Sequence, residues 1–167
     1  FHEHGTTLSG LMARHQTDPH HFLAYVHDID MSAIARDDRL GALIAALPGR
    51  KLIYTNGDAP YARRILARLG LDNTFERIYD IHDQAYQPKP APDSMTRFVA
   101  DCLITPSRAA FFEDMARNLK PAKARGVTTI WINNGSESGQ LEAHDSFIDY
   151  ETHDLSHWLA DQLETDA

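Results

Sequence analysis

Two stretches of this 167-residue sequence carry groups that could bind a phosphate. Thr55-Asn56-Gly57 offers a hydroxyl and a glycine-relaxed turn directly before a predicted helix, whose free N–H groups attract anions. Lys89 stands between Pro88 and Pro90, which fix the backbone on both sides and can aim its ammonium group at a phosphate or a carboxylate. Each stretch also has a plainer interpretation. The first is common turn chemistry, with Asp58 as a helix N-cap, and the second is a solvated loop lysine.

A third stretch, Glu113-Asp114 with Asn118, carries oxygens that suit a hard cation. The two acids directly follow four apolar residues of a predicted strand, where adjacent carboxylates are costly to desolvate without a positive charge nearby. Mg²⁺ prefers one or two carboxylates together with water and substrate phosphate. We therefore expect Asp114 to bind Mg²⁺, with Glu113 as the weaker candidate ligand. The alternative is that Asp114 only caps the following helix.

The bulk composition limits the classes of function. The formal charge is −8, from 24 acidic and 16 basic residues, which argues against a nucleic-acid binder because such proteins need clustered Lys and Arg. A small phosphorylated substrate stays compatible with this charge. The apolar runs are too short to span a membrane, so no membrane partner is expected. The single cysteine, Cys102, excludes an internal disulfide and fits a reducing cytoplasm, and we predict that it lies in the core.

Helix and strand signals alternate along most of the chain. Short helices are expected in the first 36 residues, capped by Thr6 or Thr7 and by Asp18, and a longer helix follows Asp37 or Asp38. Strands are predicted over residues 51–54, 77–81, 109–112 and 127–132, with a short fifth at Phe147-Ile148, and helices over residues 58–69, 92–103, about 118–126 and 155–163. This alternation indicates an α/β fold with a parallel sheet, in which ligands bind beyond the carboxyl ends of the strands.

Taken in order, the three stretches resemble the second, third and fourth motifs of the haloacid dehalogenase (HAD) superfamily. In that family a Thr or Ser hydroxyl binds the transferring phosphoryl group, a Lys offsets its charge, and acids after a strand hold Mg²⁺. The segment from Phe111 to Leu119 is similar to the fourth motif. The resemblance runs from Phe1 to about Trp158. It implies a Rossmann-like parallel sheet with helices on both faces and part of a small helical cap.

The resemblance also implies a role for each residue of the three stretches. Thr55, Asn56, Gly57 and Lys89 would bind the phosphate, with Thr55 and Lys89 acting in catalysis. Asp114 would hold Mg²⁺. Glu113 would orient Lys89 or a metal-bound water, and Asn118 would support these groups without binding the metal itself.

The N-terminal segment resembles the helical cap of the pyrimidine 5′-nucleotidase branch of the superfamily. The likeness rests on His2-Glu3-His4-Gly5-Thr6-Thr7-Leu8, on Gly10-Leu11-Met12 and on Ile53-Tyr54-Thr55-Asn56-Gly57. It implies hydrolysis of a nucleoside monophosphate such as UMP or CMP, by a cap over residues 1–36 and a core over residues 37–167. Gly5, Thr6 and Thr7 would then contact the substrate, although capping a helix is the plainer role for them.

The family's first motif, Asp-x-Asp-x-Thr, is absent from the sequence. It supplies the aspartyl nucleophile and the general acid or base. Asp28-Ile29-Asp30 is only superficially similar, because no buried strand precedes it, and we predict a loop there. In the family the motif ends the central strand, between the strands that here end at Asn56 and Glu113. Losing that strand would leave unpaired backbone on two neighbours. Since the sequence begins with Phe1, we expect the segment upstream, in a cleaved companion or in another chain.

The resemblance thus implies a Mg²⁺-dependent phosphomonoester hydrolase that works through an aspartyl phosphate, with its nucleophile outside this sequence. Two alternatives stay open: another HAD chemistry, such as a sugar phosphatase or a dehalogenase, and a fragment that binds Mg²⁺ or phosphate without turnover. A response-regulator receiver domain also combines acids, a Thr and a Lys-Pro around Mg²⁺. There the acidic pair precedes the Thr, whereas Asp114 follows Thr55 and Lys89 here.

Overall fold

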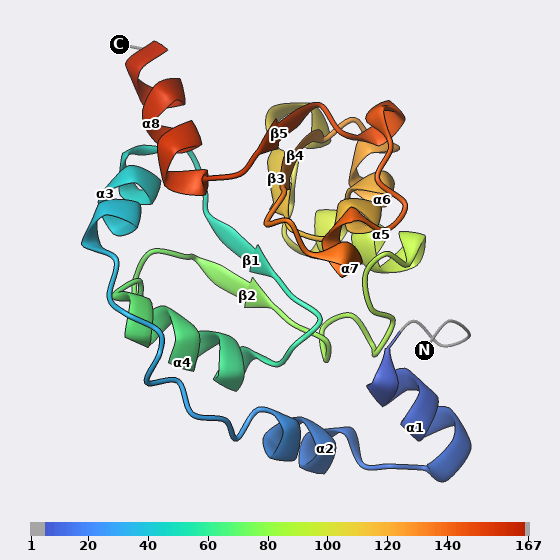
Figure 1. Ribbon diagram of the computed structural model, residues 1–167. Coiled ribbons are helices and arrows are strands. Elements are labelled where there is room, and N and C mark those ends of the chain that lie inside the picture. The colour runs from blue at the N-terminus through green and yellow to red at the C-terminus, as the bar shows by residue number, and fades with distance from the viewer. Residues whose placement is uncertain (1–5, 166–167) are drawn as a thin grey trace. The chain divides into compact units, whose positions relative to one another are not determined.

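In the computed structural model, residues 6–165 are described, and the chain forms two units, residues 1–88 and residues 89–167. The first unit contains α1 (Thr7–His15), α2 (Pro19–Val26), α3 (Asp38–Ala46), β1 (Leu52–Tyr54), α4 (Ala59–Leu69) and β2 (Arg77–Tyr79) (Figure 1). The second contains α5 (Pro92–Asp101), η1 (Pro106–Arg108), β3 (Ala110–Glu113), η2 (Ala116–Leu119), α6 (Lys120–Lys123), β4 (Thr128–Ile132), α7 (Glu137–Gln140), η3 (Asp145–Phe147), β5 (Tyr150–Thr152) and α8 (Leu155–Thr165).

Every strand pair in the described part of the chain is parallel. In the first unit β1 pairs with β2, and Tyr54 lies opposite Tyr79. In the second unit the strand order is β3-β4-β5, and Glu113 lies opposite Trp131. Helices flank both sheets: α4 contacts β2 and α6 contacts β4 (Figure 1). The predicted α/β fold with parallel strands and flanking helices is therefore confirmed.

Side-chain caps set the starts of the helices in the first unit. The Thr6 hydroxyl accepts a hydrogen bond from the Ser9 N–H at the start of α1, and the Asp37 carboxylate accepts one from Leu40 at the start of α3. Of the alternatives left open by the sequence, these two residues are the caps. Asp58 caps α4 in the same way. None of the helices within residues 6–165 has the length and apolar character of a membrane span.

Each unit has its own buried apolar cluster. In the first, Leu8 of α1, Leu23 of α2 and Ile81 pack together, so the N-terminal helices rest on the turn that follows β2. In the second, residues of η2, β4 and η3 pack together; they are Ala116, Leu119, Trp131 and Phe147. Cys102 is buried, as predicted. The boundary predicted between residues 36 and 37 stays a prediction.

The prediction of a short strand at Phe147-Ile148 is wrong. Phe147 ends the 3₁₀-helix η3, and its side chain is buried in the apolar cluster of the second unit. The last strand, β5, forms only three residues later, where Tyr150 comes into register with Ile130 of β4. The apolar signal of Phe147 therefore reflects burial beneath a turn and not pairing in the sheet. The helix predicted from about Asn118 begins earlier, as η2 at Ala116, and continues into α6.

Asp80 terminates β2 and ties it to α4. Its side chain is buried, and its two oxygens accept hydrogen bonds from the N–H groups of Ala59 at 2.9 Å, His82 at 2.9 Å and Asp83 at 3.1 Å. The carboxylate thus satisfies backbone donors at the first residue of a helix and in a turn, which otherwise need a partner. This one side chain fixes the geometry of the carboxyl edge of the first sheet.

Replacing Asp80 with Ala should lower the free energy of unfolding by about 3 kcal/mol, because three backbone donors lose a charged acceptor. Asp72→Ala is the matched control, since Asp72 is exposed, and it should change stability by less than about 0.5 kcal/mol. Urea denaturation followed by circular dichroism measures both values. Equal effects of the two substitutions would contradict the structural role of Asp80.

Candidate functional site

Lys89 and Glu113 form a buried ion pair in the second unit. The Lys89 Nζ lies 2.5 Å from Glu113 Oε2, and the two side chains are only 11% and 6% exposed. Lys89 precedes α5, and Glu113 is the last residue of β3. The ammonium also lies above the ring of Phe111, 5.6 Å from its centre. The proline-flanked lysine is therefore not a solvated loop residue, since it faces the carboxyl end of a strand.

The second oxygen of Glu113 is held by the turn that follows β3. Glu113 Oε1 accepts hydrogen bonds from Asn118 Nδ2 at 3.1 Å and from the Met115 N–H at 3.3 Å. Burial raises the pKa of Glu113, but the charge and hydrogen bond of Lys89 and the hydrogen bond of Asn118 outweigh this effect and hold the pKa below its usual value. Glu113 is therefore ionised across the neutral pH range. Asn118 Oδ1 is buried and accepts no hydrogen bond among the described residues.

Asp114 follows β3 and is the exposed member of the acidic pair. Trp131 Nε1 donates to its backbone oxygen at 3.0 Å, and a Cβ added at Gly139 would approach that oxygen to 2.9 Å. The backbone here is thus held between β4 and α7. Partial burial, a hydrogen bond shared with Glu113 and the charge of Glu113 raise the pKa of Asp114 above its ordinary value. A cation beside this carboxylate would relieve that cost.

The donor set at the end of β3 fits Mg²⁺ better than a metal that takes all its ligands from protein. Among the described residues no group of three or more His, Cys, Asp and Glu side chains could hold a metal ion. Glu113 is engaged with Lys89 and Asn118, which leaves Asp114 as the carboxylate that can face a cation. Mg²⁺ is commonly held by one or two carboxylates, with water and phosphate completing its shell. The assignment of Asp114 and Glu113 as ligands stays a prediction.

The Thr55-Asn56-Gly57 loop connects β1 to α4 in the first unit. The Thr55 hydroxyl accepts a hydrogen bond from the Gly57 N–H at 3.0 Å, and the Thr55 N–H donates to Tyr79 O at 3.0 Å. Buried Gln84 donates to Thr55 O at 2.5 Å and so fixes the loop from behind. A hydroxyl that accepts one bond can still donate another. The loop therefore presents a rigid hydroxyl at a helix N-terminus, the arrangement that an anion site needs.

His27 also faces this loop, although no local sequence pattern predicts it. Its Nδ1 lies 3.0 Å from Asp58 Oδ1, and its ring stacks on Tyr61 with centroids 4.0 Å apart. Asp58 is buried and also caps α4, as the plainer interpretation of the sequence had it. Thirty-one positions separate His27 from Asp58, too far for any local pattern. Asp80, by contrast, directly follows a strand and could have been found by the rule that identified Glu113.

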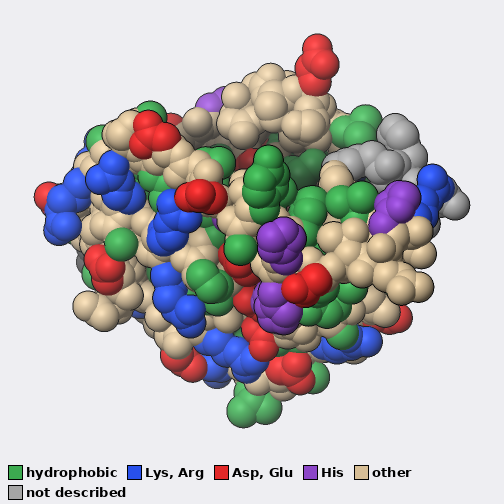
Figure 2. Space-filling model, turned by 90° about the horizontal axis from the view of Figure 1, so that it is seen from below, with side chains coloured by type: hydrophobic (Ala, Val, Ile, Leu, Met, Phe, Trp, Pro, Cys, Tyr) green, Lys and Arg blue, Asp and Glu red, His purple; other side chains and the backbone are tan. Residues whose placement is uncertain are grey.

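Two of the three N-terminal candidates, Thr6 and Thr7, lie among the described residues. Thr6 caps α1, Thr7 is exposed, and Gly5 lies outside the described residues. A contact of these residues with substrate stays a prediction. Nearby, His20 of α2 stacks on His82, with ring centroids 4.5 Å apart and an interplanar angle of 13°. Histidine side chains reach the surface on the face shown in Figure 2.

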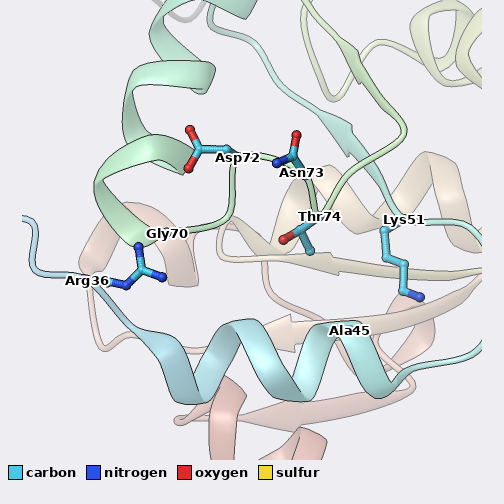
Figure 3. Close-up of a pocket in the computed structure, with 7 residues that line it drawn as sticks. All are labelled: Arg36, Ala45, Lys51, Gly70, Asp72, Asn73 and Thr74. Atoms are coloured by element: carbon cyan, nitrogen blue, oxygen red, sulfur yellow. The ribbon is translucent and has the colours of Figure 1, made fainter.

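A pocket of about 460 Å³ opens in the first unit, away from the Thr55 loop (Figure 3). Its lining includes Lys51, which precedes β1, and Thr74, which precedes β2. The pocket therefore lies toward the amino ends of these strands, whereas the Thr55 loop follows the carboxyl end of β1. Its two cations are already engaged, Arg36 with Asp38 and Lys51 with the Leu47 carbonyl. It is not part of the predicted site.

Comparison with known proteins identifies the family to which the chain belongs. The model of the haloacid dehalogenase-like hydrolases matches residues 9–126, more than half of the chain, and the chain belongs to this family of hydrolases. No curated protein matches it. Within the family, members commonly use Mg²⁺.

Several solved structures share the fold. L-2-haloacid dehalogenase from Xanthobacter autotrophicus is 17% identical, with a TM-score of 0.59, over 74% of this chain and 58% of that one. A HAD phosphatase from Thermococcus onnurineus is 23% identical, with a TM-score of 0.55, over 75% and 54%. The HAD hydrolase YfnB from Bacillus subtilis, bound to magnesium, is 18% identical, with a TM-score of 0.62, over 98% and 66%. The chain thus spans only about half to two thirds of these proteins.

Breaking the Lys89–Glu113 pair from one side should destabilise the second unit strongly. Lys89→Met and Glu113→Gln should each cost about 3 kcal/mol or more, because each leaves the partner's charge buried and unpaired. The double variant should cost clearly less than the two single costs combined. A double-mutant cycle by urea denaturation measures the coupling. Additive costs would show that the pair does not act as a unit.

Binding of Mg²⁺ should weaken as the pH falls toward the raised pKa of Asp114, because a proton and the cation compete for the same carboxylate. Calorimetric titration with MgCl₂ between pH 7 and pH 4.5 measures this. Asp114→Asn should remove the binding at every pH, and Glu164→Gln, an exposed acid on α8, should leave it unchanged. Binding that survives in the Asp114 variant would place the metal elsewhere.

Proposed function

We propose that this chain carries the phosphate-binding and metal-binding parts of a Mg²⁺-dependent phosphomonoester hydrolase. The observation that carries the proposal is the buried Lys89–Glu113 pair at the carboxyl end of β3, with Asp114 exposed beside it. An ammonium held at a strand end by a buried carboxylate is a fixed positive group, and it needs no reorganisation when an anion arrives. The exposed acid next to it supplies a ligand for the cation.

Each residue then has a task that its contacts allow. The Thr55 hydroxyl would donate a hydrogen bond to a phosphoryl oxygen, assisted by the Asn56 N–H and the relaxed turn at Gly57. Lys89 offsets the negative charge of the transferring group. Asp114, with Glu113 as a weaker ligand, would hold Mg²⁺, which when bound draws charge from the phosphoryl oxygens.

Glu113 and Asn118 serve this site by holding other groups in place. Glu113 fixes the position of Lys89, and Asn118 fixes Glu113 through its side-chain amide. Because Glu113 is bonded on both oxygens, we assign its main role to positioning. Asn118 Oδ1, buried and without a partner among the described residues, is suited to accept a hydrogen bond from a water at the metal site.

The nucleophile of the proposed reaction is not in this sequence. The first aspartate of an Asp-x-Asp-x-Thr segment would attack phosphorus, the P–O bond to the leaving group would break, and the second aspartate, as general acid, would give its proton to the leaving oxygen. Water then hydrolyses the aspartyl phosphate. The sheet edges support a further strand: within the described residues β1 pairs with β2 alone, and β3 pairs with β4 alone. We place the missing segment upstream or on a companion chain.

As substrate we propose a nucleoside monophosphate such as UMP or CMP. The proposal rests on the resemblance of the N-terminal segment and the Ile53–Gly57 region to pyrimidine 5′-nucleotidases, in which the cap closes over base and sugar. A dehalogenase is the second candidate, because several structural neighbours are dehalogenases. The acidic pair favours the phosphatase: its cost is offset by a divalent cation that bridges to phosphate, and displacement of a halide requires no such cation.

The test compares the 167-residue chain alone with the same chain joined to, or mixed with, a segment that carries Asp-x-Asp-x-Thr. We expect release of phosphate from UMP only with the added segment and only with Mg²⁺. Turnover by the chain alone would overturn the missing-nucleophile argument. A substrate panel of UMP, CMP, a sugar phosphate and a 2-haloacid separates the candidates, since release of halide without Mg²⁺ would favour a dehalogenase.

When the chain is combined with the added Asp-x-Asp-x-Thr segment, Thr55→Ala should lower kcat by about 10²–10³. This is the usual loss when one donor to a transition-state oxyanion is removed. Ser9→Ala is the control, because this hydroxyl belongs to the cap of α1. A steady-state assay of phosphate release measures both. An unchanged kcat in the Thr55 variant would remove the loop from the site.

A further inference from the structure

The imidazole of His27 lies against the Thr55-Asn56-Gly57 loop of the first unit. A Cβ placed on Gly57 would lie 3.4 Å from Thr55 Oγ1 and 3.6 Å from His27 Cε1, so the threonine hydroxyl and the ring edge flank the same point. Cε1 is the ring atom between the two nitrogens, so the edge that carries both nitrogens faces the loop. The side chain is 18% exposed, so the ring is not sealed from solvent.

Two contacts fix the ring. Asp58 Oδ1 lies 3.0 Å from Nδ1, and Tyr61 stacks on the ring face at an interplanar angle of 7°. A carboxylate is an acceptor only, so Nδ1 carries a proton. Nε2 then presents a lone pair when the ring is neutral and an N–H when it is protonated. Only the protonated ring can donate to an anion at the loop.

We propose that His27 is a further phosphate-binding residue, which takes up the phosphate of the substrate at the Thr55 loop in its imidazolium form. This inference rests on the proposed function, because it needs the Thr55 loop to bind phosphate. The histidine comes from the segment between α2 and α3, so it would also make phosphate binding depend on the N-terminal helices. Binding of phosphate and binding of a proton to His27 then favour each other.

Charged and polar groups from two segments surround His27. From α4, Asp58 contacts the ring, Tyr61 stacks on it, and Arg64 donates to the His27 carbonyl oxygen at 2.9 Å. Asp28 is the next residue in the chain. Arg64 directs its charge to the backbone side, whereas the carboxylate of Asp58 touches the ring itself. When the ring is protonated, it has an anionic partner on one nitrogen and can bind a second anion with the other.

The alternative is that His27 only attaches the N-terminal helices to α4. His27→Asn separates the two roles, because the Asn amide can still donate to Asp58 but carries no charge. His21→Asn is the matched control, since His21 is exposed on α2, six positions earlier. Stability by urea denaturation is measured in parallel with binding of inorganic phosphate by calorimetry at pH 5.5 and pH 8.

We expect His27→Asn to bind phosphate roughly tenfold more weakly than the parent chain at pH 5.5 and equally well at pH 8. Comparing two chains at one pH cancels the titration of phosphate itself. In NMR, added phosphate should raise the pH midpoint of the His27 Cε1–H signal by roughly one pH unit, which corresponds to the same tenfold coupling. The His21 variant should match the parent in every measurement.

Thr55→Ala distinguishes failure of this inference from failure of the proposed function. If phosphate binding needs Thr55 but is equal in the parent and in His27→Asn at both pH values, the inference is overturned and the phosphate loop stands. If the parent binds no phosphate, or Thr55→Ala changes nothing, the loop is not a phosphate site, and both are overturned. A loss of stability without the pH-dependent loss of binding would assign His27 a structural role only.

Discussion

The second unit depends on keeping the carboxylate of Glu113 charged at the buried end of β3. Burial disfavours that charge. The ion pair with Lys89 and the hydrogen bond from the Asn118 amide replace the stabilisation that water would provide. The lysine therefore stands in the loop that leads into α5, and the turn after β3 brings Asn118 back toward the strand. Asp114 is left as the acid that faces outward, with its pKa raised by its neighbour. The result is an exposed carboxylate next to a fixed ammonium group.

In the first unit, buried polar side chains are stabilised by hydrogen bonds to the backbone and not by an ion pair. Buried Asp80 joins the start of α4 to the turn after β2, and buried Gln84 holds the carbonyl of Thr55 from behind. Each of these groups engages donors or acceptors that would otherwise be buried without partners. The Thr55 hydroxyl therefore stands on a loop with little freedom, as a group that must recognise an anion in one position requires.

Features that depend on neighbouring residues, such as helix caps, could be predicted from the sequence. Contacts between residues far apart in the chain could not. Helix caps such as Asp18 and Asp58 were found because capping needs only neighbouring residues. The sequence also placed Glu113 and Asp114 correctly at the end of a buried strand, because four apolar residues precede them. Their role as metal ligands stays a prediction. The end of the sheet was misplaced, since an apolar Phe147 looks the same beneath a turn as in a strand. The contact of His27 with Asp58 left no local pattern, and only the packed chain brings the two together.

Binding and turnover have separable physical requirements in this chain. Oriented donors and a fixed cation can bind a phosphate without any nucleophile, because their contribution is electrostatic. Bond making needs a reacting oxygen aligned with phosphorus, which a preorganised site supplies only when that group belongs to it. Within the described residues β1 pairs only with β2 and β3 only with β4, so each sheet has an edge strand that a further strand can join. Under our proposal, a segment that supplied the reacting oxygen from a strand on one of these edges would add backbone pairing and chemistry together, so its binding and turnover would depend on the same contact.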